Sequence, residues 1–228
     1  MLRRRLTRAF MLLALLSVAA WLAGCSAAAA QWSLDVEKAM DAIGVAPGMI
    51  VGEAGAGDGY FTFPLLHRLG VKGAVYANDI DGRALARLRS RAAREGDTNV
   101  FTVVGEVDDP LFPRTDLHMV VVVHAFHEFT RPVEWMVNTR KYLRPGGTLA
   151  IVDIDPERGR DRNHFWPRDR ILGYAKQAGY DLVKIADDGG EHMFIVLRPQ
   201  VVIGAHASSR PVADARIVSG RLAPGAKQ

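Results

Sequence analysis

The stretch that most constrains the fold of this 228-residue chain is residues 49–60, which read M-I-V-G-E-A-G-A-G-D-G-Y. A short apolar run leads into an acid, Glu53, and then into three alternating glycines, Gly55, Gly57 and Gly59. Glycine has no Cβ and adopts positive φ without penalty, so such a loop can turn sharply and approach a ligand closely. A buried strand that ends in this kind of loop, with a helix after it, is typical of nucleotide-type binding sites.

The hydrophobic pattern of the rest of the chain alternates between strand-like and helix-like periods. Strands are expected at residues 49–51, 74–78, 100–104, 117–123, 148–154, 180–185 and 192–197. Helices are expected at residues 32–43, 59–69 (capped by Asp58), 82–95 (capped by Asp81), 130–143 and 167–178, with a sharp turn at 145–147. The alternation predicts a doubly wound α/β sheet that binds ligands at the carboxyl ends of its strands.

Two nucleotide-type cofactors compete for the glycine loop. The dinucleotide pattern G-x-G-x-x-G would need a third glycine at position 60, where the chain has Tyr60, and this disfavours an NAD-dependent oxidoreductase. No G-K-[ST] follows the glycines, which excludes a phosphate-binding P-loop. Asp79, about 20 residues beyond the last glycine and at the end of the second strand, is placed to accept hydrogen bonds from ribose hydroxyls of either cofactor.

Several motifs in order resemble the class I S-adenosylmethionine-dependent methyltransferases: E-A-G-A-G-D-G, Y-A-N-D-I-D, the acidic loop G-E-V-D-D-P, the apolar fourth strand and L-R-P-G-G-T-L. The resemblance covers about Trp32 to Pro199. It implies a Rossmann-like sheet of seven strands with the last strand antiparallel, and S-adenosylmethionine as the cofactor.

The resemblance also implies which residues meet the cofactor. Glu53 would lie near its ammonium group, Asp79 would accept from its ribose, and Glu106 would lie near its adenine, with Asp108 as a second candidate. Backbone N–H groups after Gly59 would meet its carboxylate. The full set implied for cofactor binding is Glu53, Gly55, Gly57, Gly59, Asp79, Glu106, Asp108 and His124.

The acceptor side is expected at the mouth of the fourth strand, where H-A-F-H-E occupies residues 124–128. Methyl transfer depends largely on orientation, and an oxygen or nitrogen acceptor can also need a base. His127 and Glu128 are the candidate catalytic residues, and His164 and Trp166 could shape an acceptor pocket. His124, His127 and Glu128 would suit a metal by residue type, but no metal is expected at a cofactor-binding edge.

The N-terminus has the layout of a secretory signal: a basic segment, an apolar run at 10–22 and small residues. It ends in L-A-G-C, which resembles the lipobox of bacterial lipoproteins and implies cleavage and lipidation at Cys25, the only cysteine. The expected organisation is a signal peptide (1–24), a lipidated tether (25–31), the methyltransferase domain (32–198) and a disordered tail (199–228). The expected location is the bacterial envelope, or facing the cytosol if the signal is not processed.

The net charge of +4 gives no support for a nucleic-acid partner. The first 24 residues hold four arginines and no acid, and the 29 basic residues less these four equal the 25 acidic residues. The acceptor itself is not identified by the sequence, and a small molecule is the expected class. Because the lipobox exports the protein while S-adenosylmethionine is made in the cytosol, an exported binding module without catalysis remains an alternative on the same fold. The sequence does not indicate which oligomeric state the protein adopts.

Overall fold

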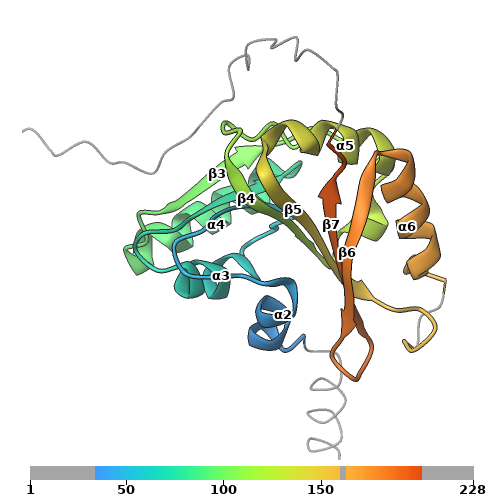
Figure 1. The fold of residues 1–228 in the computed structure, drawn as a ribbon. Coiled ribbons are helices and arrows are strands. Elements are labelled where there is room, and N and C mark those ends of the chain that lie inside the picture. Colours follow the sequence, from blue (N-terminus) through green and yellow to red (C-terminus); the bar gives the residue numbers. More distant parts are fainter. Residues whose placement is uncertain (1–33, 160–162, 202–228) are drawn as a thin grey trace, which may run out of the picture. The chain divides into compact units, whose positions relative to one another are not determined.

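A computed structural model describes residues 34–159 and 163–201 (Figure 1). The chain divides into two units, Met1–Asp35 and Val36–Gln228, and the fold below belongs to the second. The predicted signal peptide, Cys25, the tether and the tail beyond residue 201 lie outside the described residues. Within the described ranges, no helix combines the length and the apolar character needed to cross a bilayer.

Seven strands form one sheet in the order β3-β2-β1-β4-β5-β7-β6. Only β7 runs antiparallel to its neighbours, β5 and β6. The predicted doubly wound sheet with an antiparallel last strand is therefore confirmed. The strands are β1 (Ile50–Ala54), β2 (Ala74–Asp79), β3 (Val100–Val104), β4 (Leu117–Val123), β5 (Leu143–Ile154), β6 (Tyr180–Asp187) and β7 (His192–Pro199).

Helices cover both faces of this sheet (Figure 1). Helices α2 and α3 contact each other on one face, where α4 packs on β2 and β3, and α5 contacts α6 on the other. The helices are α2 (Val36–Ile43), α3 (Thr62–Leu69), α4 (Gly82–Glu95), α5 (Pro132–Thr139) and α6 (Arg168–Gln177), with short 3-10 turns η1 (Phe126–Glu128) and η2 (Arg140–Tyr142).

The centre of the sheet is buried on both faces, as the unbroken valines of β4 predict. Val120 and Val122 pack in one cluster with Trp135 of α5 and Ile171 of α6. Val121 on the opposite side of the strand is also fully buried. Because the core fixes β4 from both sides, the loop that leaves its carboxyl end starts from a rigid position.

The start of α3 differs from the prediction. The helix begins at Thr62 rather than at residue 59, its N-cap is Phe61, and the expected cap Asp58 lies outside it. The reason is Gly59, whose φ of +101° is not helical. A Cβ at Gly59 would also lie 2.4 Å from the ring of Phe63, so the protein's own packing requires this glycine.

The chain between α5 and β5 also differs from the prediction. Helix α5 ends at Thr139, and β5 begins at Leu143, so residues 145–147 belong to the strand instead of a separate turn. The pairing of β4 with β5 shifts register there, and a Cβ at Gly147 would lie 2.9 Å from the carbonyl oxygen of Leu117. Gly146 and Gly147 thus let an irregular strand pass close to β4.

The predicted cap of α4 is confirmed, since Asp81 accepts from the N–H of Arg83 at 2.8 Å.

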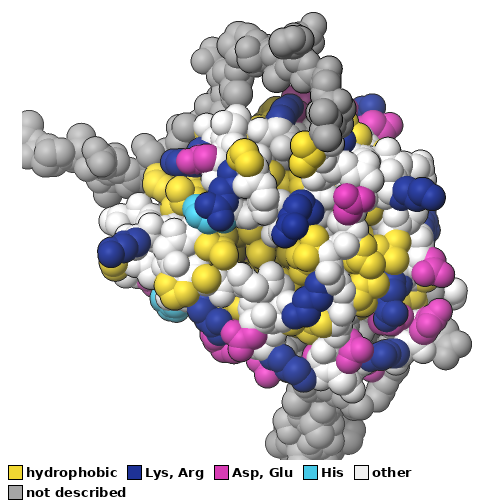
Figure 2. All heavy atoms as spheres, viewed as in Figure 1, with side chains coloured by type: hydrophobic (Ala, Val, Ile, Leu, Met, Phe, Trp, Pro, Cys, Tyr) yellow, Lys and Arg dark blue, Asp and Glu magenta, His cyan; other side chains and the backbone are white. Residues whose placement is uncertain are grey.

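Charges of both signs are interspersed on the face viewed in Figure 1. Figure 2 shows Lys and Arg side chains among Asp and Glu side chains across this face, with apolar side chains between them. This mixed distribution agrees with the balanced charge of residues 25–228.

Candidate functional site

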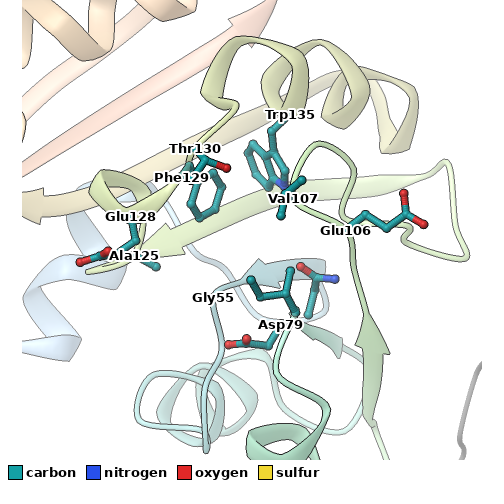
Figure 3. A pocket seen from close by; sticks show the side chains of 11 residues that line it. Gly55, Asp79, Glu106, Val107, Ala125, Glu128, Phe129, Thr130 and Trp135 are labelled. Carbon is teal, nitrogen blue, oxygen red and sulfur yellow. The ribbon is translucent and has the colours of Figure 1, made fainter.

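A cavity of about 290 Å³ opens at the carboxyl ends of β1, β2 and β4, where the fold predicts a ligand (Figure 3). Its volume is near the lower end of the range for small-molecule sites, about 300–1,000 Å³. Four residues predicted from the sequence lie in its wall, namely Gly55, Asp79, Glu106 and Glu128. The wall is completed by Asn78, Ile80, Val107, Ala125, Phe129, Thr130 and Trp135.

The glycine loop brings the backbone close to this cavity. Gly55 has a φ of +73°, and a Cβ there would lie only 2.4 Å from the Cβ of Ala125, so the loops after β1 and β4 touch. Gly57 has a φ of +56°, and a Cβ there would meet nothing within 4 Å. The glycine at 57 therefore leaves open space beside the loop, in contrast to Gly59.

Asp79 is fixed at the cavity wall by two backbone hydrogen bonds. One carboxylate oxygen, Oδ2, accepts from the N–H of Gly57 at 2.8 Å, and the other, Oδ1, accepts from the N–H of Asp81 at 2.8 Å. These bonds hold the glycine loop and the start of α4 to the same side chain. Each carboxylate oxygen has a second lone pair and can still accept from a ligand hydroxyl.

Glu53 lies beneath the loop and does not line the cavity. Its side chain is 2% exposed, and its Oε2 accepts a hydrogen bond from the Thr62 hydroxyl at 2.6 Å. Burial raises the pKa of Glu53 to about 8, because the ionised carboxylate loses its hydration. The Thr62 hydrogen bond lowers this pKa in part, and the charge of Asp79 raises it further.

The acidic loop after β3 is anchored by several hydrogen bonds. The buried Asn78 side chain donates to the carbonyls of Val103 at 3.1 Å and Pro110 at 2.7 Å. Glu106 donates its N–H to the carbonyl of Asp109 at 2.8 Å. The Asp109 carboxylate accepts from the Tyr142 hydroxyl at 2.6 Å and pairs with Lys141. Burial and this carboxylate hold the pKa of Tyr142 far above its ordinary value.

The two acids proposed for the adenine side of the pocket are not equivalent. Glu106 lies in the wall, and Figure 3 shows it at the opposite end of the cavity from Glu128, with its carboxylate turned outward. Asp108 lies outside the wall, because its carboxylate pairs with Arg131 and its carbonyl accepts from Asn138 at 2.8 Å. The structure therefore brings Glu106, and not Asp108, to the cavity.

One side of the cavity is aromatic and was not identified from the sequence. Phe129 and Trp135 lie along it, with ring centroids 4.9 Å apart (Figure 3). Trp135 is 2% exposed, so the ring belongs to the core as much as to the site. Its place in the predicted helix after residue 130 gave no indication of the face it would occupy.

The two candidate catalytic residues lie together, and one of them, Glu128, lies in the wall at one end of the cavity. His127 is nearly buried, and its Nδ1 lies 2.9 and 3.0 Å from the two carboxylate oxygens of Asp153. Its Nε2 lies 3.5 Å from Oε1 of Glu128, which is exposed and lines the cavity. Asp153 was missed from the sequence, although it follows directly after Val152, the partner of Val123 in the β4–β5 register.

His124 is placed away from the cavity. Its φ of +50° turns it out of the β4 direction, and its ring stacks on His192 with centroids 5.1 Å apart. Burial lowers the pKa of His124, and the nearby charge of His192 lowers it further. The cavity wall does not include His124, although it includes the next residue, Ala125.

The two loop residues before α6 that were expected to shape an acceptor pocket lie in different surroundings. Trp166 packs against Phe126 with ring centroids 5.7 Å apart and against Tyr174 with ring centroids 5.3 Å apart, so its contacts are with other aromatic rings of the fold. His164 instead lies against His127, with ring centroids 4.7 Å apart, and near Glu128.

The strand order, the glycine loop after β1 and the acid after β2 agree with the fold that the resemblance to the class I methyltransferases implies. Residues 51–147, somewhat less than half of the chain, match a family model described as a methyltransferase domain. The similar solved structures agree on the fold. A SAM-dependent methyltransferase from Aquifex aeolicus is 22% identical with a TM-score of 0.67, over 72% of this chain and 88% of that chain. A glycopeptide N-methyltransferase, MtfA, in complex with S-adenosyl-L-methionine is 16% identical with a TM-score of 0.61, over 73% and 87%.

Curated relatives are longer proteins. The chain is 30% identical over 112 residues to the hybrid PKS-NRPS synthetase tasS of Hapsidospora irregularis, covering 47% of this chain and 3% of that protein. It is 26% identical over 152 residues to the methyltransferase gedG of Aspergillus terreus, covering 66% of this chain and 44% of that protein. The chain thus spans less than half the length of each of these two relatives.

Proposed function

We propose that this protein transfers a methyl group from S-adenosylmethionine to a small-molecule acceptor. One observation carries the proposal. Asp79 lies in the cavity wall and accepts a hydrogen bond from the N–H of Gly57, which joins the glycine loop to the cavity. A free lone pair on each Asp79 oxygen suits the two ribose hydroxyls. The open space at Gly57 suits the close approach of a ligand, and the aromatic side of the cavity suits an adenine ring.

In this proposal the residues of the chain bind and orient the cofactor. Asp79 accepts from the ribose and Glu106 lies at the adenine end, and both line the cavity together with Gly55. The backbone of the loop that runs from Gly55 through Gly57 and Gly59 meets the amino-acid end. Glu53 supports this end from beneath, where its carboxyl group is close enough to Asp79 for their charges to interact. Bound S-adenosylmethionine supplies an electrophilic methyl group on a sulfonium, and in-line displacement by the acceptor transfers it.

At the other end of the cavity, His127 and Glu128 are the groups proposed to handle the acceptor. The bond between Nδ1 of His127 and Asp153 fixes the ring and leaves Nε2 facing Glu128. A nitrogen held in this way can orient an acceptor hydroxyl or take its proton.

The purified chain is expected to bind S-adenosylhomocysteine and not NAD, because its loop lacks the third glycine of the dinucleotide pattern. Isothermal titration calorimetry with S-adenosylmethionine, S-adenosylhomocysteine and NAD tests this. Saturable binding of NAD without binding of S-adenosylhomocysteine would support the oxidoreductase and refute the proposal. Cofactor binding without turnover on any acceptor, over a broad panel, would favour the exported binding module.

We further propose that the protein is a lipoprotein of the bacterial envelope, anchored through Cys25. Support comes from the L-A-G-C motif after a basic and then apolar segment, and from the absence of any second cysteine in the sequence. Several acyl chains, each contributing about 0.8 kcal/mol per buried CH₂, would hold the protein at the membrane.

Cys25→Ala is expected to leave an unprocessed and unlipidated precursor when the gene is expressed in a bacterial host. Fractionation of wild type and variant, with mass spectrometry of the N-terminus, measures this. A wild-type protein that begins at Met1 or lacks lipid at Cys25 would show that the domain is not anchored in this way. The domain could then meet cofactor in the cytosol.

A further inference from the structure

Three side chains converge beside the cavity in a pattern that suits a metal ion. His127, Glu128 and His164, here called the His127 cluster, each offer one ligand atom, and these atoms all lie within 4.8 Å of one another. The Nε2 of His127 is 3.5 Å and the Nε2 of His164 is 3.4 Å from the same carboxylate oxygen, Oε1 of Glu128. The two imidazoles come from segments more than 30 residues apart in the sequence.

The distances fit metal coordination better than direct hydrogen bonding. A charge-assisted hydrogen bond between an imidazole and a carboxylate is about 2.7–2.9 Å long. Two ligand atoms held about 2.0–2.1 Å from a tetrahedral Zn²⁺ are about 3.3 Å apart. The two separations of 3.4 and 3.5 Å match the second value, and the remaining pair of ligand atoms lies within 4.8 Å. Adjustment of the exposed His164 and Glu128 side chains would bring all three atoms around one ion.

The surroundings of His127 supply what a metal-binding histidine needs. Asp153 is 1% exposed and lies 2.9 Å from Nδ1. In the tautomer that carries its proton on Nδ1, the ring donates to this carboxylate and the lone pair of Nε2 is available to the cluster. Such a carboxylate behind a histidine is a common partner of metal-ligating imidazoles. The ring is held further by Phe165, whose centroid lies 4.6 Å away.

We propose that the His127 cluster binds one divalent transition-metal ion, for which Zn²⁺ is the probe. Two histidines and one carboxylate are ligands that such ions prefer, and three protein ligands leave at least one coordination position open. Glu128 lines the cavity, so the ion would lie at its edge. The site differs from the one considered from the sequence, because His164 takes the place of His124.

The consequence for catalysis rests on the proposed function. The open position would take a hydroxyl oxygen of the acceptor, which makes an oxygen-bearing small molecule the substrate class. The ion would lower the pKa of that hydroxyl, its proton would leave to solvent, the new O–CH₃ bond would form and the S–CH₃ bond would break. The products are the methyl ether, S-adenosylhomocysteine and a proton. His127 would then be a metal ligand instead of a base.

The test is calorimetric titration of Zn²⁺ into the full-length, chelator-treated chain without cofactor or acceptor. Wild type is expected to bind one equivalent tightly, while His164→Gln and Glu128→Gln bind it at least tenfold more weakly. Both side chains are half exposed or more, so these variants retain the fold, which circular dichroism verifies. His67→Gln, which removes an exposed histidine of α3, is the matched control and should bind as wild type does.

Asp153→Asn tests the positioning role separately and should weaken Zn²⁺ binding about 10- to 100-fold while its cluster remains complete. Equal Zn²⁺ affinity of wild type and His164→Gln, or no saturable binding by wild type, would overturn the proposal. S-adenosylhomocysteine binding is measured on the same samples. If the chain binds S-adenosylhomocysteine but does not bind Zn²⁺ at this cluster, only the metal site is refuted. If it binds Zn²⁺ but not S-adenosylhomocysteine, only the methyltransferase proposal is refuted.

Discussion

Asp79→Ala is expected to weaken S-adenosylhomocysteine binding about 5- to 150-fold, because the loss of a charged acceptor for two ribose hydroxyls costs about 1–3 kcal/mol. The variant also removes the acceptor for the Gly57 N–H, so the glycine loop would lose part of its support. Calorimetry gives the dissociation constant directly.

The matched control is Asp81→Ala, which removes a carboxylate two residues away. Asp81 caps α4 through the N–H of Arg83 and does not line the cavity. It is expected to lower the thermal stability slightly and to leave the dissociation constant unchanged. If Asp79→Ala and Asp81→Ala bind the ligand equally well, Asp79 only connects the loop to the helix and does not contact the ribose.

The second large effect concerns pH and the buried Glu53. Its pKa is about 8 in the folded chain against about 4.5 unfolded, so the folded state binds the extra proton between these values. The contribution of Glu53 to the free energy of unfolding is fully present below pH 4.5 and is lost as the pH rises through 8. The free energy of unfolding of wild type should therefore fall by a few kcal/mol between about pH 5 and pH 9.

Glu53→Gln removes the titrating group and keeps an acceptor for the Thr62 hydroxyl. Urea unfolding at several pH values should then show a smaller decline for the variant than for wild type. Asp58→Asn, which removes an exposed acid of the same loop, controls for the change in net charge and should follow the wild-type curve. Parallel curves for wild type and Glu53→Gln would mean that Glu53 is ionised in the folded state at neutral pH.

The fold could be predicted from the sequence because each element carries its own local pattern. The valines of β4, the glycines after β1 and the cap at Asp81 act within a few residues of themselves, and all three were predicted and found. The helix start at Thr62 was predicted wrongly, because it depends on the Phe63 ring packing against Gly59.

The site could be predicted only where a strand end determines it. Asp79 and Glu128 lie in the cavity as expected, since the carboxyl ends of parallel strands meet at one edge. Asp108 could not be distinguished from Glu106, because its partner Arg131 belongs to a later segment. His164 reaches His127 through the fold of a long loop, and no local pattern in the sequence indicates that contact.

The anchoring of the acidic loop after β3 affects how tightly a ligand can bind. Gly105 donates to the carbonyl of Asp79 at 3.1 Å, Asn78 holds Pro110, and Asp109 is held by Tyr142. The conformational entropy of this segment is therefore lost during folding and not during association. A preorganised wall makes no further entropic demand when a ligand arrives, so a larger share of the contact energy contributes to affinity.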